Sequence, residues 1–230
     1  MVLNVEELRA ELLRVANPAN APAMQAYMKS SMPFLGVASG DMRRTCRRWF
    51  ASLELPTAAA WRRAVLTLWR GARHREERYA AIELTGIRGA ARFQTTAALP
   101  MYEEMIVTGA WWDYVDVIAK HRLGPLLRLW PEPMRRTMLE WSRSDDMWQR
   151  RSAILCQLGF KAETDCDLLY ACIEPSLGSA EFFLRKAIGW ALRQYAWTDP
   201  DEVRRFVRRK ERELSPLSRR EALKNLEASR

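Results

Sequence analysis

The stretch TGAWWDYVDVIAKHRLG, residues 108–124, places two adjacent tryptophans just before two aspartates. On a helix, Trp111 would share a buried stripe with Val115 and Ile118. Trp112 and Asp116 would then face the same way on the neighbouring stripe, at the edge of the buried face. An indole there can pack on a base or a sugar, and a carboxylate beside it can stabilise positive charge. We therefore treat Trp112 and Asp116 as candidate site residues, and we expect Asp116 to contribute little to folding.

Cationic side chains recur beside apolar helical faces elsewhere in the chain. Trp190 would share one helix stripe with Lys186 and Arg193. Two tryptophans, with a carboxylate near one and cations near the other, would line a groove that stacks rings and attracts phosphates. The remaining candidate cations are Arg151 and, in the arginine ridge SGDMRRTCRRWF, Arg43 and Arg47.

Each of these features also has an ordinary structural explanation. A single tryptophan is more often a residue of the core edge than of an active site. Asp116 alone could be a surface acid that pairs along its helix, and an arginine ridge is most often a solvated face. The functional hypothesis therefore depends on the combination of these residues and not on any one of them.

The composition narrows the chemistry that the chain can perform. It has 230 residues, of which 48% are hydrophobic, enough for one sizeable core or two small ones. Having only His74 and His121 argues against metallohydrolase or Ser-His-Asp chemistry, so a carboxylate would carry the acid–base work. The four cysteines show no CxxC spacing, which predicts no metal site and reduced cytosolic thiols. No apolar run reaches the roughly 20 residues of a membrane span, and the charged N-terminus is not a secretory signal.

The net charge of +9 is unevenly distributed along the chain. Residues 1–100 contain 15 Lys and Arg against 8 Asp and Glu, residues 101–200 contain 12 against 14, and residues 201–230 contain 10 against 6. Basic ends suit a polyanion such as a nucleic-acid backbone. An acidic middle suits a cationic group, although a charge excess of this size more often serves solubility than a binding site.

Helical periodicity organises the chain, and strand signals are almost absent. Proline and Asx residues mark helix starts: we expect Ser39 or Asp41 to cap one helix, and Pro131 and Pro200 to open two others. Short helices joined by tight connections predict an all-α, HEAT-like helical-repeat solenoid of antiparallel pairs with a concave binding face, in one domain over 1–230. The predicted helices are 4–16, 21–30, 39–52, 57–72, 74–91, 96–109, 111–127, 131–142, 146–158, 163–173, 178–196, 199–212 and 216–227.

Five blocks of this sequence resemble bacterial DNA alkylation repair proteins of the AlkD type, in order and with similar spacing over nearly the whole chain. They are YMKSSMPFLGV (27–37), MIVTGAWWDYVD (105–116), SDDMWQRRSAILCQL (144–158), EFFLRKAIGWALRQYA (181–196) and LSPLSRREALKN (214–225). One departure is the turn after FLG, which commonly contains proline in that family and reads ASGD here.

The resemblance implies a DNA glycosylase that hydrolyses the N-glycosidic bond of N3- or N7-alkylated purines in duplex DNA, without metal or cofactor. It assigns the catalytic carboxylate to Asp116 and the paired indoles to Trp112 and Trp190. Asp116 would stabilise an oxocarbenium-like transition state and orient water. The predicted DNA contacts are Tyr27, Ser39, Arg43, Arg47, Arg151, Lys186 and Arg193.

Two other interpretations remain open at this stage. A non-catalytic DNA-binding scaffold could keep the fold and lose turnover, and a protein-interaction solenoid would leave the basic ends without a role. The retention of Asp116 with both tryptophans favours the enzyme. We expect a monomer in the bacterial cytoplasm, associated with the nucleoid through alkylated duplex DNA and with no membrane or metal partner.

Overall fold

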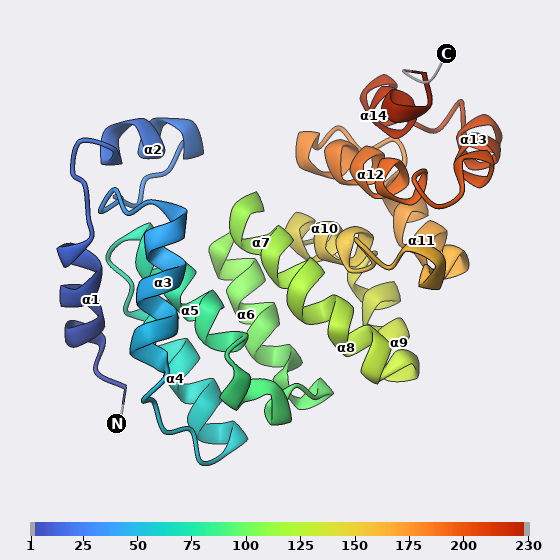
Figure 1. Ribbon diagram of the computed structural model, residues 1–230. Helices are drawn as coiled ribbons and strands as arrows, with labels where there is room; N and C mark the ends of the chain where they lie inside the picture. The colour runs from blue at the N-terminus through green and yellow to red at the C-terminus, as the bar shows by residue number, and fades with distance from the viewer. Residues whose placement is uncertain (1–2, 228–230) are drawn as a thin grey trace. The chain divides into compact units, whose positions relative to one another are not determined.

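The computed structural model describes residues 3–227, and every regular element in that range is a helix. Figure 1 shows the α-helices in chain order. They are α1 (Val5–Arg14), α2 (Ala21–Met28), α3 (Ser39–Phe50), α4 (Ala58–Arg70), α5 (Arg75–Thr85), α6 (Leu99–Gly109), α7 (Trp112–Ile118), α8 (Gly124–Leu129), α9 (Pro131–Trp141), α10 (Met147–Leu155), α11 (Cys166–Ile173), α12 (Phe182–Tyr195), α13 (Pro200–Arg209) and α14 (Pro216–Glu227). The prediction of an all-α chain is confirmed.

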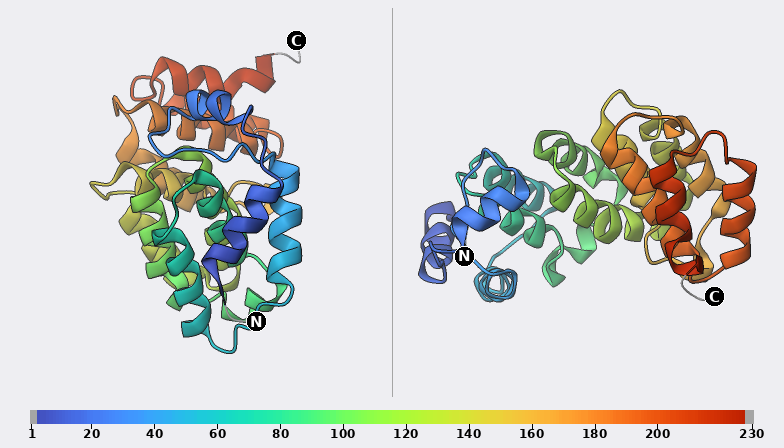
Figure 2. Two further views of the ribbon diagram at one scale, coloured as in Figure 1. Left: turned by 90° about the vertical axis from the view of Figure 1, so that its left-hand side faces the viewer. Right: turned by 90° about the horizontal axis from the view of Figure 1, so that it is seen from above.

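The chain divides into two compact units, with the boundary between Met101 and Tyr102 inside α6. In the first unit α3 packs on α1 and α5, and α4 packs on α5. In the second unit α8 packs on α9, and α12 packs on α10 and α14, which Figure 2 shows from two further directions. Helices that pack on near neighbours in the chain are the pattern of a helical-repeat solenoid, as predicted. The assignment of 1–230 to one domain stays a prediction.

Two helices begin at the prolines that the sequence indicated. Helix α9 starts at Pro131, and α13 starts at Pro200 with Asp199 as its N-cap. The Asp199 carboxylate accepts the N–H of Glu202 at 2.9 Å. Proline suits the first helical position because the N–H it lacks would have had no helical partner there.

Helix α3 begins differently from the prediction. Ser39 is its first helical residue, and the extended Ala38 is the N-cap, without a side-chain hydrogen bond. Asp41 lies in the first turn and pairs with Arg44. The prediction that Ser39 or Asp41 caps this helix is therefore wrong, although the acidic side chain still lies near the positive end of the helix dipole.

The predicted helix 111–127 is interrupted in the middle. Residues Ala119–Leu123 form a π-helical turn between α7 and α8. Pro125 has no N–H, so the carbonyl of His121 loses its helical donor. The side chain of Arg122 donates to that carbonyl at 2.9 Å. The proline therefore explains why the α-helix does not continue, and π turns of this kind often occur near functional sites.

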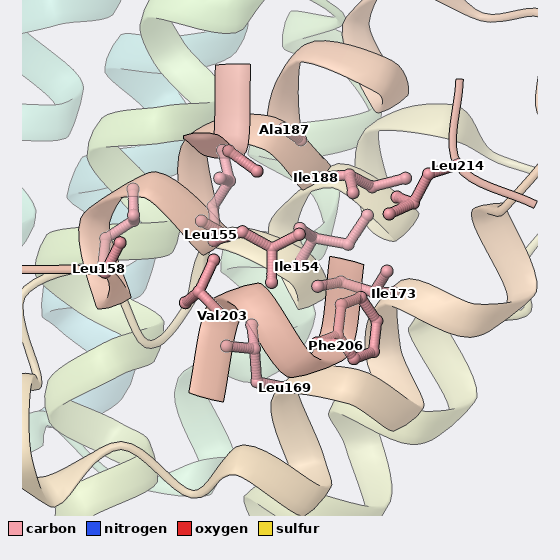
Figure 3. Close-up of a cluster of buried hydrophobic side chains, with 14 of the residues drawn as sticks. Ile154, Leu155, Leu158, Leu169, Ile173, Ala187, Ile188, Val203, Phe206 and Leu214 are labelled. Carbon is pink, nitrogen blue, oxygen red and sulfur yellow. The ribbon is translucent and has the colours of Figure 1, made fainter. Parts of the chain in front are cut away.

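Helices α10 to α13 bring apolar side chains to a common core in the second unit, which Figure 3 shows. Ile154 comes from α10, Leu169 from α11, Ile188 from α12 and Phe206 from α13, and all four are buried. Burying side chains of this size contributes about 1.5–3 kcal/mol each. This core fixes α10 and α12, which carry four of the candidate site residues: Arg151, Lys186, Trp190 and Arg193.

Gly189 allows α14 to approach α12 very closely. A Cβ atom at Gly189 would lie 2.5 Å from the Cβ of Glu221 and 2.9 Å from the carbonyl oxygen of Ser218. The Ser218 hydroxyl also donates to the carbonyl of Arg185 at 3.0 Å. The glycine is therefore a packing requirement, because backbone atoms leave no room for a methyl group.

We expect Gly189→Ala to destabilise the protein. The clash should cost about 1–3 kcal/mol, which exceeds the roughly 1 kcal/mol that alanine gains as the better helix former. The measurement is the midpoint of denaturant unfolding. Gly89→Ala is the matched control, since a Cβ there meets nothing within 4 Å. A Gly189→Ala protein as stable as the unmodified one would mean that α14 can shift freely.

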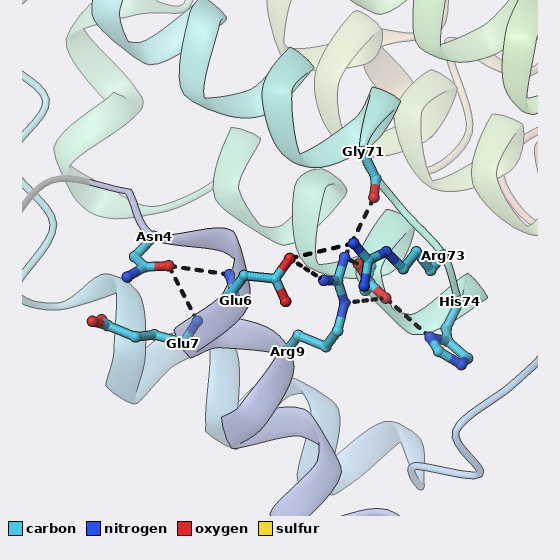
Figure 4. A network of polar contacts seen from close by, with 8 residues as sticks. Asn4, Glu6, Glu7, Arg9, Gly71, Arg73 and His74 are labelled. Atoms are coloured by element: carbon cyan, nitrogen blue, oxygen red, sulfur yellow. Dashed lines mark hydrogen bonds and ion pairs between the residues drawn. The ribbon is translucent and has the colours of Figure 1, made fainter.

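A buried polar network ties α1 to α5 in the first unit, and Figure 4 shows it. Arg9 donates from Nε and Nη2 to the Glu77 carboxylate at 3.1 and 2.7 Å, and Nδ1 of His74 lies 3.0 Å from the same carboxylate. Burial raises the pKa of Glu77, but the hydrogen bonds from Arg9 and His74 outweigh burial and hold this pKa below its ordinary value. The carboxylate therefore stays charged and paired.

The adjacent residue, Glu76, anchors the loop that contains the FLG sequence. Its buried carboxylate accepts the backbone N–H groups of Leu35, Gly36 and Val37 at 2.9–3.1 Å. Gly36 has φ +85°, and a Cβ atom there would lie 2.0 Å from the carbonyl oxygen of Asn17. Only glycine fits this conformation and this space, so the loop before α3 has a defined path.

Candidate active site

The chain enters α7 through an unusual turn. Ala110, after the end of α6, has φ 44°, a left-handed conformation that is uncommon for a residue other than glycine. Trp111 follows as the extended N-cap of α7 and lies outside the helix. The prediction that Trp111 is on a buried helical stripe is therefore wrong. Its ring packs against Trp148 and Phe183, at centroid distances of 6.2 and 5.3 Å. This aromatic contact fixes the start of α7 against α10 and α12.

Trp112 and Asp116 lie one turn apart on α7, as predicted, and both are partly buried. The buried side of the helix is formed by Tyr114, Val115 and Ile118. The two candidate residues therefore lie at the edge of this buried face, where each side chain is partly exposed to solvent.

Asp116 is held by Arg151 of α10. Nε and Nη2 of Arg151 donate to the two carboxylate oxygens of Asp116, each at 2.8 Å. Nη1 donates to the carbonyl of Phe183 at 2.5 Å. The Arg151 side chain is 5% exposed and that of Asp116 is 12% exposed. Such a bidentate pair fixes both the position and the orientation of the carboxylate.

Two opposing effects act on the ionisation of Asp116. Burial raises the pKa of this carboxyl above its ordinary value, and the negative charge of Asp113 adds to the rise. The hydrogen bonds and the charge of Arg151 lower the same pKa. Arg151 therefore offsets part of the rise in pKa that burial causes and favours the charged form of the carboxyl group.

This pair changes the expectation that Asp116 matters little to folding. A carboxylate that neutralises a buried arginine contributes to stability, because its removal leaves a buried charge without a partner. It also gives Arg151 a role that the sequence did not indicate. The guanidinium is turned inward onto Asp116 and Phe183, and its predicted contact with DNA stays a prediction.

Lys186 and Arg193 share one partner, Glu221 of α14. Lys186 Nζ lies 3.1 Å from Oε1, and Arg193 Nη1 pairs with Oε2 of the same carboxylate. Trp190 lies between these cations on α12 and is half-buried against the core that Figure 3 shows. Burial raises the pKa of Glu221, but Lys186 and Arg193 outweigh burial and hold this pKa below its ordinary value.

The first unit carries the other predicted DNA contacts. Tyr27 on α2 is 76% exposed, and Ser39 is exposed at the start of α3. Arg43 and Arg47 are exposed on α3 and line a hollow together with Arg88. Their roles stay predictions, and the structure adds that these side chains are accessible to a ligand.

The arginine ridge of α3 divides into two kinds of side chain. Arg44 pairs with Asp41, and Arg48 pairs with Glu11 of α1 at 3.0 Å. Among the described residues, no ion pair forms with Arg43 or Arg47. Only half of the ridge is therefore available to an anion without breaking an existing contact.

Sequence reasoning missed the residues that hold the candidate site groups. Neither Glu221 nor Phe183 was predicted to contact a candidate site residue, because neither stands at a helical spacing from its partner. Glu221 is 28 positions from Arg193, and Phe183 is 32 positions from Arg151. The only local signal was the motif EFFLRKAIGWALRQYA itself, which contains Phe183.

Within residues 3–227, no group of three or more His, Cys, Asp and Glu side chains has the arrangement of a metal site. All four cysteines are free thiols, three of them buried. Among the described residues, no helix has both the length and the apolar composition to cross a membrane.

Comparisons with known proteins agree with the resemblance seen in the sequence. A family model described as DNA alkylation repair enzyme matches residues 8–226. A solved structure described as a predicted DNA alkylation repair enzyme from Enterococcus faecalis is 30% identical, with a TM-score of 0.82 over 91% of this chain and 95% of that chain. No curated protein matches the chain. Because the family model spans nearly all of the sequence, the chain belongs to the DNA alkylation repair enzyme family.

Proposed function

We propose that the protein is a DNA glycosylase that hydrolyses the N-glycosidic bond of cationic N3- or N7-alkylated purines in duplex DNA. The observation that carries this proposal is the Asp116 carboxylate, which Arg151 holds in a fixed orientation one turn after Trp112. Membership of the alkylation repair family supports DNA with alkylated bases as the substrate.

The reaction that we propose needs little more than a placed carboxylate. An alkylated purine is already cationic, so it departs neutral with the electron pair of the C1′–N bond. The sugar then carries positive charge, as in glycoside hydrolysis. Water adds its oxygen to C1′ and releases one proton to the solvent. Asp116 would stabilise the sugar cation and orient this water, and no general acid is required.

Two features of Asp116 support this role. A carboxylate has about four lone-pair positions, and Arg151 uses one on each oxygen. The partial exposure of the Asp116 side chain leaves a path to a ligand. Trp112 and Trp190, both partly exposed, would pack on the sugar and backbone and attract the developing charge through their ring faces.

The test is release of free base. We expect the purified protein to release methylated purine from methylated duplex DNA, and to do so with a chelator present, because the proposed chemistry uses no metal ion. Analysis of the released bases by chromatography provides the measurement. Binding to methylated DNA without base release would instead support a non-catalytic DNA-binding scaffold, and loss of release in chelator would contradict the mechanism.

DNA binding should weaken steeply as salt rises, since phosphates that pair with arginines release counterions. We expect the double variant Arg43→Gln/Arg47→Gln to reduce the slope of log affinity against log salt by about 0.9 for each lost phosphate contact. Titration of a fluorescent duplex at several salt concentrations measures this slope.

The matched control lies on the same helix. Arg44→Gln/Arg48→Gln removes the same charge from side chains that already pair with Asp41 and Glu11. We expect this variant to change the slope less. Equal changes of the slope in the two variants would show that DNA affinity depends on the net charge of α3 and that Arg43 and Arg47 do not contact phosphates directly.

A further inference from the structure

Lys186, Arg193 and Glu221 form a cluster in which one carboxylate pairs with two cations. Each oxygen of the Glu221 carboxylate meets one cation, Oε1 with Lys186 and Oε2 with Arg193. The two non-bridging oxygens of a DNA phosphate could meet the same cations in the same way. The carboxylate therefore occupies the position that an external anion would take.

Glu221 is built firmly into this position. Its Cβ faces Gly189, where α12 and α14 approach so closely that a methyl group would not fit. Ser218 ties the same turn of α14 to the Arg185 carbonyl, and Ala222 is buried in the core. The lowered pKa of Glu221 keeps its carboxylate charged. The two cations, in contrast, have long flexible side chains that are 37% and 24% exposed.

We propose that Glu221 is an internal competitor for DNA phosphate, which holds Lys186 and Arg193 in the free protein and so limits their contribution to DNA binding. The inference rests on the proposed function only in taking duplex DNA as the ligand. Because the backbone of Glu221 is anchored and the two cations are on long, partly exposed side chains, DNA would gain these contacts by rotation of the cations away from Glu221.

This arrangement has a consequence for DNA that carries no lesion. Every stretch of duplex offers phosphates, so free cations would strengthen binding everywhere. A carboxylate that pairs with both cations lowers this sequence-independent affinity while leaving both cations beside Trp190. Separating the two cations from Glu221 is unfavourable, so it occurs only where further contacts, such as those to an alkylated base, strengthen DNA binding.

The test uses an undamaged fluorescent duplex and the full chain. Glu221→Gln keeps the size of the side chain and removes the charge. We expect tighter binding of this duplex, and a slope of log affinity against log salt that is steeper by about 0.9 for each cation that gains a phosphate. Adding Lys186→Gln to the Glu221→Gln protein should reduce this slope clearly, whereas Lys186→Gln alone should change it little.

Glu211→Gln is the matched control. It removes the same charge from the C-terminal part of the chain and breaks the exposed pair with Arg219. An equal rise in affinity in both variants would overturn the inference, because net charge alone would explain it. So would an unchanged slope in a Glu221→Gln protein whose thermal unfolding shows it to be folded, or failure of both this variant and the unmodified chain to bind DNA. Base release from methylated DNA by the unmodified protein tests the proposed function separately.

Discussion

Asp116→Asn slows the release of methylated base from duplex DNA by on the order of 10²-fold or more, if the carboxylate stabilises the sugar cation as proposed. Asparagine keeps the size and the helical position, but it has no charge to offset the positive sugar. Single-turnover base release is the measurement, because it reports on bond cleavage apart from DNA binding and product release.

The Asp116–Arg151 pair means that this variant also loses stability. Asparagine can keep one hydrogen bond to the guanidinium, but the charge-assisted pair is lost, at a cost of about 1.5–3 kcal/mol. Thermal unfolding must therefore accompany the kinetics, at a temperature where the variant is fully folded. A folded Asp116→Asn protein with full activity would remove this carboxylate from the chemistry.

Asp113→Asn is the control for Asp116→Asn. Asp113 lies on the same helix, three residues earlier, and its negative charge raises the pKa of Asp116. We expect a much smaller loss of base release in this variant. Equal losses of base release in the two variants would indicate that only the total negative charge of α7 matters, or that both variants disturb the structure.

Arg151→Gln should have the largest effect on stability together with a shift in pH dependence. Removing the guanidinium leaves Asp116 as a buried carboxylate without its cation, which costs about 3–5 kcal/mol. Arg151 lowers the pKa of Asp116 while burial raises it, so its loss moves that pKa upward. The reaction needs the charged carboxylate, and the acid limb of the rate–pH profile should therefore move to higher pH.

Two further variants make the Arg151→Gln result interpretable. Arg150→Gln removes the same charge from the neighbouring position of α10 and should leave the acid limb where it is. The double variant Arg151→Gln/Asp116→Asn should be more stable than Arg151→Gln alone, because it no longer buries an unpaired charge. An Arg151→Gln protein with the pH profile of the unmodified chain would show that Arg151 does not control the ionisation of Asp116.

The sequence by itself located most of the helices and supplied the candidate site residues, whose roles stay predictions. Apolar residues at helical spacing located the helices, and prolines marked the starts of α9 and α13, because both signals act within one or two turns. The edge position of Asp116 beside Trp112 followed from the same periodicity. The resemblance to alkylation repair proteins came from local blocks such as MIVTGAWWDYVD.

Residue spacing did not predict two local details of the helices, the N-cap of α3 and the π turn after α7. The helix cap predicted at Ser39 or Asp41 lies at Ala38, whose extended backbone ends the preceding loop. The sequence pattern also hid the π turn between α7 and α8, although Pro125 was the local cause. In both cases the apolar periodicity was intact, so it carried no information about these details.

Only the tertiary structure decided what the charged residues do. Arg151 is 35 positions from Asp116, and Glu221 is 28 positions from Arg193. Whether such residues meet depends on which helix faces pack together and how closely. Gly189 illustrates the reason: its missing side chain brings α14 onto α12 and Glu221 between two cations. Helical periodicity indicates which side of a helix is buried. Which residue it contacts across the interface depends on the packing of helices that are far apart in the sequence.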